Sequence, residues 1–173
     1  MRHLLKLHPE SRCDAVDQIA IEVARQRGRL TLNYRMTGRI ADLRLPSPRQ
    51  PLRIDGLWQF TCFEAFLRAG TEEPYFEFNF SPSTAWAAYR FDSYREGMRA
   101  ADAAPAMEAS SGGGVFRLQA ALNGLPLERS WHLGISAVIE EKSGRKSYWA
   151  LKHPPGNPDF HHPDGFALDL AGA

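Results

Sequence analysis

Residues 57–67 read Leu57-Trp58-Gln59-Phe60-Thr61-Cys62-Phe63-Glu64-Ala65-Phe66-Leu67, and residues 75–82 read Tyr75-Phe76-Glu77-Phe78-Asn79-Phe80-Ser81-Pro82. In the second stretch bulky apolar side chains alternate with polar ones, which is the period of a β-strand with two different faces. Phe76, Phe78 and Phe80 share one face, which we expect to pack in the core. Tyr75, Glu77 and Asn79 then share the opposite face. The pattern predicts an antiparallel hairpin, with strands over 61–68 and 75–81.

The turn between these strands sets which residues lie opposite each other. Gly70-Thr71-Glu72-Glu73-Pro74 connects them, and a turn at Gly70-Thr71 places Cys62 opposite Asn79, Glu64 opposite Glu77 and Phe66 opposite Tyr75. Two carboxylates directly opposite on neighbouring strands repel each other. This register therefore predicts a compensating partner: a shared proton, a bound cation or an arginine. We expect Arg90 in that role, with Tyr89 and Phe91 pointing to the core.

Working outward, the same period of two recurs along the chain. Ile19–Arg25 and Leu30–Met36 flank Gln26-Arg27-Gly28, where Gly28 supplies the positive φ of a tight hairpin turn. Further strands are expected at Trp86–Phe91, Ala106–Ser110, Val115–Leu122, Trp131–Glu140, Ser147–Lys152 and Phe166–Leu170. Proline-containing stretches from Arg44 to Asp55 and from Lys152 to Gly165 are expected to be long loops. Strands about ten residues apart predict one all-β domain over 1–173, an antiparallel two-sheet sandwich of about nine to eleven strands.

Composition excludes several classes of partner. The chain has 21 Lys and Arg against 20 Asp and Glu, a net charge of +1, which argues against a nucleic-acid binder. No window approaches the roughly 18 uninterrupted apolar residues that a membrane-spanning helix needs. Acidic and basic residues interrupt residues 1–25, so no signal peptide is expected there, and the expected compartment is the cytoplasm. In that reducing setting Cys13 and Cys62 are expected to be free thiols.

The hairpin also resembles a known family. The order Trp, then Cys-Phe-Glu-Ala-Phe on one strand and Tyr-Phe-Glu-Phe-Asn-Phe-Ser-Pro on the next, is similar to type 9 carbohydrate-binding modules and the wider DOMON-like ligand-binding superfamily. Phe160-His161-His162-Pro163-Asp164-Gly165-Phe166-Ala167-Leu168 resembles the closing strand of those modules. The resemblance spans roughly residues 15–170. It implies an immunoglobulin-like or jelly-roll sandwich, whose relatives bind sugars or haem.

Sugar binding requires aromatic faces for the C–H groups of a pyranose ring and polar groups for its hydroxyls. The resemblance places Trp58 at the position of a binding-site tryptophan, and Trp149, just before the second long loop, is our candidate for an opposing plane. Trp131 opens an alternating apolar run and is expected in the core. The predicted ligand-binding set, at a cleft on the rim of the sandwich, is Trp58, Glu64, Glu77, Asn79, Arg90, Trp149, His161 and His162.

The sequence supports binding of haem or a metal ion less well than binding of a sugar. Haem needs two axial ligands, which could come from Met98 or Met107 and from a histidine of the last loop: His153, His161 or His162. That loop holds metal-ligand residue types, but none of the standard zinc spacings occurs. Calcium bound by loop carboxylates and carbonyls is compatible with the fold, without a location. No cofactor is therefore predicted.

The expected function is non-catalytic binding of a small carbohydrate or sugar-bearing ligand. The alternative is a protein–protein interaction or assembly module without a small-molecule pocket, and haem binding is the third interpretation. Opposed Glu64 and Glu77 resemble the carboxyl pair of glycoside hydrolases, which keeps catalysis open. No nucleophile elbow, phosphate-binding loop or dinucleotide fingerprint occurs. Oligomeric state is not predicted.

Overall fold

The fold is built almost entirely of β-strands. The computed structural model describes residues 2–124 and 129–172. Its strands are β1 (Arg2–Leu4), β2 (Lys6–Leu7), β3 (Val16–Gln26), β4 (Arg29–Gly38), β5 (Cys62–Ala69), β6 (Tyr75–Phe80), β7 (Trp86–Phe91), β8 (Arg99–Ala100), β9 (Ala106–Gly112), β10 (Val115–Leu122), β11 (Trp131–Glu140), β12 (Lys146–Ala150) and β13 (Leu168–Leu170). Three short 3-10 helices occur, η1 (Ile40–Asp42), η2 (Leu57–Gln59) and η3 (Pro163–Gly165). None of the described helices is long and apolar enough to cross a membrane.

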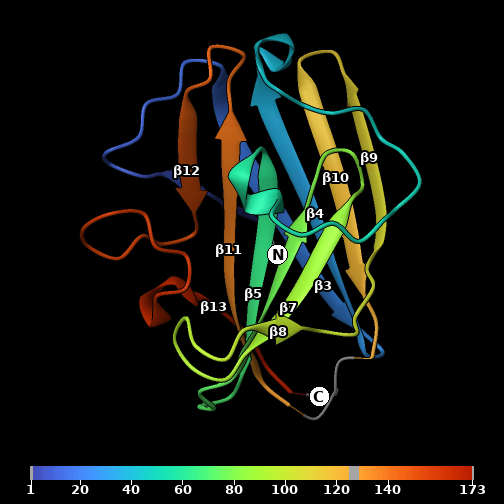
Figure 1. The fold of residues 1–173 in the computed structure, drawn as a ribbon, viewed down its shortest axis with the longest axis vertical. Coiled ribbons are helices and arrows are strands. Elements are labelled where there is room, and N and C mark those ends of the chain that lie inside the picture. The colour runs from blue at the N-terminus through green and yellow to red at the C-terminus, as the bar shows by residue number, and fades with distance from the viewer. Residues whose placement is uncertain (1, 125–128, 173) are drawn as a thin grey trace.

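The strands form two antiparallel sheets that pack as a sandwich (Figure 1). The smaller sheet has the order β1-β3-β4-β10-β9. The larger sheet, in front in Figure 1, has the order β2-β12-β11-β5-β6-β7-β8, with β13 beside β11. This confirms the predicted fold class. The short edge strands β1, β2 and β8 were not predicted, because two or three residues carry no periodic pattern.

The core between the sheets consists of the apolar side chains that point inward at alternate positions of the strands. The β3–β4 hairpin turns where expected, with Arg27 and Gly28 at φ of 49° and 75°. Phe78 and Phe80 of β6 are buried in this core, as predicted, and the partly buried Phe76 packs against it. Phe63 of β5 stacks on Phe116 of β10 at 5.6 Å between ring centroids, which joins the two sheets. Trp131 is buried in the same core, also as predicted.

The predicted register of the β5–β6 hairpin is wrong by two residues. Glu64 pairs with Asn79, and Phe66 pairs with Glu77. The reason is that β5 continues to Ala69 and the backbone N–H of Gly70 donates to the carbonyl of Ser130, so the turn forms one residue later than expected. A shift of two keeps every side chain on its predicted face. Glu64 and Glu77 therefore share a face as diagonal neighbours and are not directly opposite.

The prediction for Arg90 is wrong in a different way. β6 pairs with β7 so that Glu77 lies opposite Tyr89 and Phe76 lies opposite Arg90. Directly opposite residues point to the same side of a sheet, so Tyr89 and Phe91 join Glu77, and Arg90 points to the other face. Both faces of the larger sheet carry apolar layers, so an aromatic side chain fits either one. Arg90 is not the partner of the glutamates.

A second apolar cluster covers the outer face of the larger sheet. It consists of Leu57, Cys62, Phe66, Tyr75, Ala85, Ala87, Tyr89, Phe91 and Phe166, with Phe160 packed against it. The second predicted long loop lies over this face, whereas the end of the first runs along the edge of the sheet beside β7, where the backbone N–H of Ile54 donates to the Trp86 carbonyl oxygen at 2.9 Å. Gly134 of β11 makes room for the second loop: a Cβ at Gly134 would meet the Gly165 carbonyl oxygen at 3.2 Å and the Phe66 Cβ at 3.4 Å. The missing side chain brings the C-terminal loop down onto the sheet.

Candidate functional site

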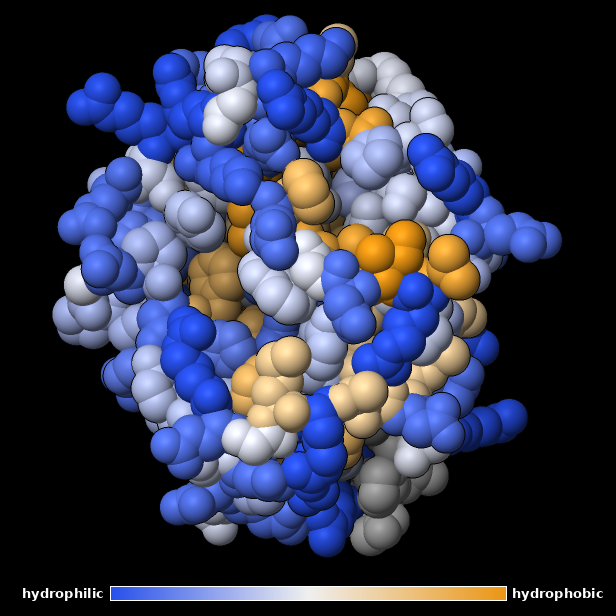
Figure 2. Space-filling model, viewed as in Figure 1, coloured by the Kyte–Doolittle hydropathy of each residue, from blue (hydrophilic) through white to orange (hydrophobic). Residues whose placement is uncertain are grey.

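A cleft of about 430 Å³ opens on the outer face of the larger sheet. Figure 2 shows this face hollowed, with apolar residues inside a largely hydrophilic surround. The cleft is lined by Trp58, Glu64, Phe66, Glu77, Phe91, Arg95, Met98, Val138, Tyr148, Pro158, Phe160 and His161. Four of the predicted site residues are thus brought together here. This cleft lies on the sheet face, whereas the ligand site was expected at the rim of the sandwich, because loops that cover the sheet build the walls here.

Trp58 stands at the mouth of the cleft with 41% of its surface exposed. It is carried by η2, which buries Leu57 against the sheet. The Trp58 ring meets the Tyr89 ring edge-on, with 5.9 Å between centroids. The Tyr89 hydroxyl donates to Asp55 Oδ1 at 2.7 Å, which fixes the loop that precedes η2. An exposed indole held from below is a preformed apolar platform.

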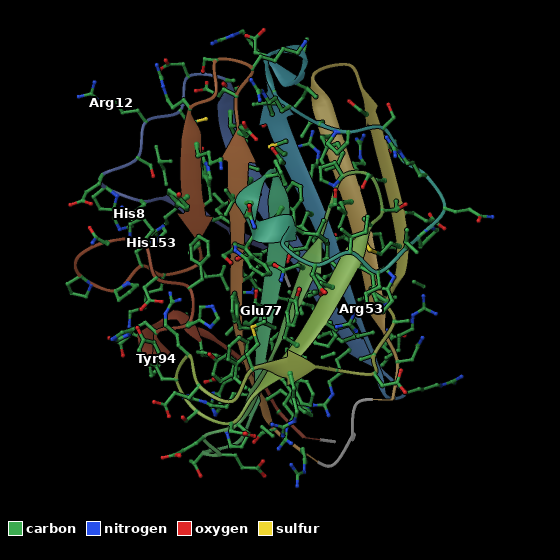
Figure 3. All side chains as sticks on the ribbon, in the orientation of Figure 1. His8, Arg12, Arg53, Glu77, Tyr94 and His153 are labelled. Atoms are coloured by element: carbon green, nitrogen blue, oxygen red, sulfur yellow. The ribbon has the colours of Figure 1, made fainter. Side chains whose placement is uncertain are left out.

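Glu64 and Glu77 lie at the bottom of the cleft, and Figure 3 shows Glu77 near the middle of the sheet face. They are 2% and 6% exposed. The Ser136 hydroxyl donates to Glu64 Oε2 at 3.0 Å, and the Asn79 amide donates to Glu77 Oε1 at 2.7 Å. Burial raises the pKa of both carboxyls, and the charge of Glu77 raises the pKa of Glu64 further. The hydrogen bonds from Ser136 and Asn79 lower these pKa values, but burial outweighs them, so both groups hold protons more tightly than exposed carboxyls do.

His161 connects Glu77 to Tyr75 on the wall of the cleft. The Tyr75 hydroxyl accepts the backbone N–H of Arg95 at 3.2 Å and lies 2.7 Å from His161 Nδ1. With the hydroxyl proton donated to Nδ1, the other ring nitrogen carries its hydrogen toward Glu77 Oε2, 3.6 Å away. Burial, followed by the charge of Arg95, lowers the pKa of His161 to about 4. His161 is therefore a neutral donor at neutral pH and forms no ion pair with Glu77.

Asp159 ties the two loops that flank this wall. Its carboxylate accepts from the Arg95 guanidinium at 2.7 Å, from the Tyr94 hydroxyl and from the backbone N–H of His161 at 3.1 Å. Figure 3 shows Tyr94 beside the C-terminal loop. Arg95 itself has φ of 59°, in the left-handed region. Asp159 thus positions Arg95 and His161 together.

Besides Arg90, three predicted residues lie outside the cleft lining. Asn79 is fully buried below it and acts through its hydrogen bond to Glu77. Trp149 is buried in the core between the sheets, where its indole N–H donates to Ser147 Oγ at 2.9 Å, so it offers no opposing plane. Its place in β12 turns it to the inner face of the sheet. His162 caps η3 by accepting the backbone N–H of Asp164 at 3.2 Å.

Some of the residues considered as haem or metal ligands line the cleft, and others lie elsewhere. Met98 and His161 line the cleft, whereas Met107 is buried in the core between the sheets. His153 Nε2 donates to the Lys6 carbonyl oxygen at 2.8 Å. The described residues contain no group of three or more histidine, cysteine and acidic side chains that could hold a metal ion.

Eight of the twelve residues that line the cleft are absent from the predicted ligand-binding set, and one of the eight, Met98, was considered only as a haem ligand. Phe66 and Phe91 line its floor, Arg95 and Met98 come from the segment between β7 and β8, and Tyr148 and Phe160 form one wall with their rings 6.2 Å apart. The face of Phe66 was predictable from alternation. The loop residues carry no local pattern that would place them here.

A second hollow, of about 420 Å³, lies on the outer face of the smaller sheet. Charged and amide side chains dominate its lining, among them Arg35, Glu108, Arg117 and Gln119. Its one aromatic residue, Tyr34, is 1% exposed. Of these two hollows, the cleft on the larger sheet is the one that combines aromatic rings with buried polar groups.

Comparison with known proteins supports the fold. No protein-family model matches the chain, and neither does any curated protein. A solved structure, that of a candidate carbohydrate-binding protein from Bacteroides uniformis, superposes with a TM-score of 0.69 at 12% sequence identity. The match covers 95% of this chain and 83% of that one. At this identity the likeness shows the sandwich fold, and the site must be argued from its own residues.

Proposed function

We propose that the chain binds a small carbohydrate or sugar-bearing ligand, without catalysis, in the cleft between Trp58 and the Glu64–Glu77 pair. The observation that carries the proposal is the meeting of an exposed indole with buried carboxyls in one cleft. A volume of about 430 Å³ suits a small molecule. Aromatic rings fit the C–H faces of a pyranose, and the carboxyl and imidazole groups fit its hydroxyls.

Two likenesses support this proposal. The hairpin and the position of Trp58 resemble type 9 carbohydrate-binding modules of the DOMON-like superfamily. The Bacteroides uniformis protein that shares the fold is described as a candidate carbohydrate-binding protein. The proposal places the protein in the cytoplasm, where Cys13 and Cys62 stay reduced.

The test is a thermal-shift and calorimetric screen of mono- and disaccharides with the wild-type chain. A ligand that binds the folded state alone raises its stability by about 2.7 kcal/mol at a hundredfold excess over Kd. We expect Trp58→Ala to weaken binding of the best sugar at least about tenfold. Phe60→Ala is the matched control, because Phe60 lies in the same loop, is 62% exposed and is absent from the cleft lining. Equal losses in both variants, or no sugar that binds, would contradict the proposal.

The second candidate function is a protein–protein module. The observation that favours it is a set of exposed apolar side chains on the loop before β5, namely Leu52, Ile54 and Phe60. Such side chains mark interaction surfaces when they are contiguous. A chain that binds no sugar but loses self-association or partner binding on Phe60→Ala would support this alternative.

A further inference from the structure

The carboxyl pair in the cleft has a property that hydroxyl recognition does not require. Each glutamate is buried, and each has one oxygen that accepts a hydrogen bond from a neutral side chain, Ser136 or Asn79. Glu64 Oε1 has no hydrogen-bond partner among the residues that the structure describes. Glu77 Oε2 lies 3.6 Å from His161 Nε2, beyond hydrogen-bond length. Two oxygens of the pair thus keep free acceptor positions in a lined cleft.

The pair also has no fixed counterion. Arg95 lines the cleft, but its guanidinium is bound to Asp159 at 2.7 Å and forms no ion pair with either glutamate. Its charge lowers the pKa of Glu77, but burial outweighs this effect and the pKa stays raised. Arg90 points to the other face of the sheet. The remaining ionisable groups around the pair are neutral at neutral pH: His161, with its lowered pKa, and Tyr34, Cys62 and Tyr75, with raised ones. A buried carboxylate without a cation is strongly unfavourable, so the carboxyl pair retains protons when no cationic ligand is bound.

The walls of the cleft favour a cation as well. Phe66, Phe91, Tyr148, Phe160 and Trp58 surround the space above the carboxyls. The faces of aromatic rings attract ammonium groups, most strongly where water is excluded. An ammonium group with three N–H donors would supply both the missing positive charge and donors for the two free oxygens. Neutral hydroxyls would supply the donors without the charge.

We propose that the cleft selects an amino sugar, whose protonated primary amine binds between Glu64 and Glu77 while its ring packs against Trp58. The inference rests on the proposed sugar-binding function. On binding, the ammonium keeps its own three hydrogens, and the proton held by the carboxyl pair is released to solvent. No covalent bond forms or breaks in the ligand.

Calorimetry with glucosamine, glucose and N-acetylglucosamine at about pH 7 tests this. Glucose has the ring and hydroxyls without the amine, and N-acetylglucosamine has a neutral amide in its place. A charge-assisted hydrogen bond contributes roughly twice as much as a neutral one, so we expect glucosamine to bind at least about tenfold more tightly than either. Titration in two buffers of different ionisation enthalpy is expected to show net proton release with glucosamine alone.

Glu77→Gln is expected to remove both the preference for glucosamine over glucose, measured as the ratio of the two affinities in the same variant, and the proton release. Glu108→Gln is the matched control, because Glu108 lies on the outer face of the smaller sheet. Thermal unfolding checks that both variants are folded.

Each contrary result has a distinct meaning. Equal affinity for glucosamine and glucose would overturn the inference and leave sugar binding intact. Binding of none of the three sugars, with a disaccharide screen also negative, would overturn the proposed function. Ethanolamine that binds as tightly as glucosamine would show an amine site without sugar recognition, which also overturns the inference.

Discussion

Cys62 is a buried reactive group next to the site, two residues before Glu64 on the outer face of β5. Its side chain is fully buried, and burial raises the pKa of the thiol, so the nucleophilic thiolate is scarce. Cys13 is half-buried and serves as an internal comparison. With a thiol reagent under native conditions, we expect one equivalent to react rapidly and the second to react when denaturant unfolds the chain. Cys13→Ser should remove the rapid phase, and two rapid equivalents in the wild type would contradict this burial.

At the residue scale, alternation predicted which β5 and β6 side chains face the cleft. The β5–β6 register was wrong by two residues, but this prediction stays correct, because a shift by an even number of residues leaves each side chain on the same face of the sheet. The face of Arg90 was predicted wrongly. We assigned Tyr89 and Phe91 to the core because they are hydrophobic, but both belong to the outer apolar cluster, and Arg90 therefore points to the opposite face. Where both faces of a strand are apolar, the pattern of a single strand does not show which face is the core.

At the element scale, the cleft depends on how closely the C-terminal loop approaches β11. Gly134→Ala would place a Cβ at 3.2 Å from the Gly165 carbonyl oxygen, so the loop that carries Phe160 and His161 must move outward. We expect at least about a tenfold loss of ligand affinity, with destabilisation of roughly 1–3 kcal/mol from overpacking. Gly112→Ala, at a position with no atom within 4 Å of the added Cβ, should change neither quantity. Wild-type affinity in the Gly134 variant would show that the loop is not set by this contact.

Contacts between distant segments also explain why several cleft residues could not be predicted from the sequence. The strands were predictable because each carries its own period, whereas Arg95 and Phe160 reach the cleft through contacts between distant loops. The bonds of Asp159 to Tyr94 and Arg95 span more than sixty residues. No local spacing encodes such a contact. Trp149 is the opposite case. It was predicted to lie at the site because it is close to the second loop in sequence, but its position in β12 turns its side chain into the core between the sheets.

At the scale of the whole molecule, the carboxyl pair links folding stability to pH. Burial raises the pKa of Glu64 and Glu77 in the folded state above the value of about 4.3 that glutamate has in unfolded chains. Above that value the folded state binds more protons than the unfolded one, so the free energy of unfolding falls as pH rises. His161 acts oppositely, because its pKa is lowered to about 4 and its contribution to stability is lost as pH falls from about 6.5.

The two effects separate above about pH 7.5, one unit above the pKa of an unperturbed histidine, where histidine is almost entirely neutral in both states. There we expect the stability of the wild type to decline with rising pH more steeply than that of Glu77→Gln, which loses one buried carboxyl and relieves the charge that raises the pKa of Glu64. The limiting slope is about 1.4 kcal/mol per pH unit for each proton retained. Urea unfolding at a series of pH values measures it, with Glu108→Gln expected to follow the wild type. Parallel curves for the wild type and Glu77→Gln would mean that the pair is ionised and compensated in the folded protein, and that an ammonium ligand has no charge to neutralise.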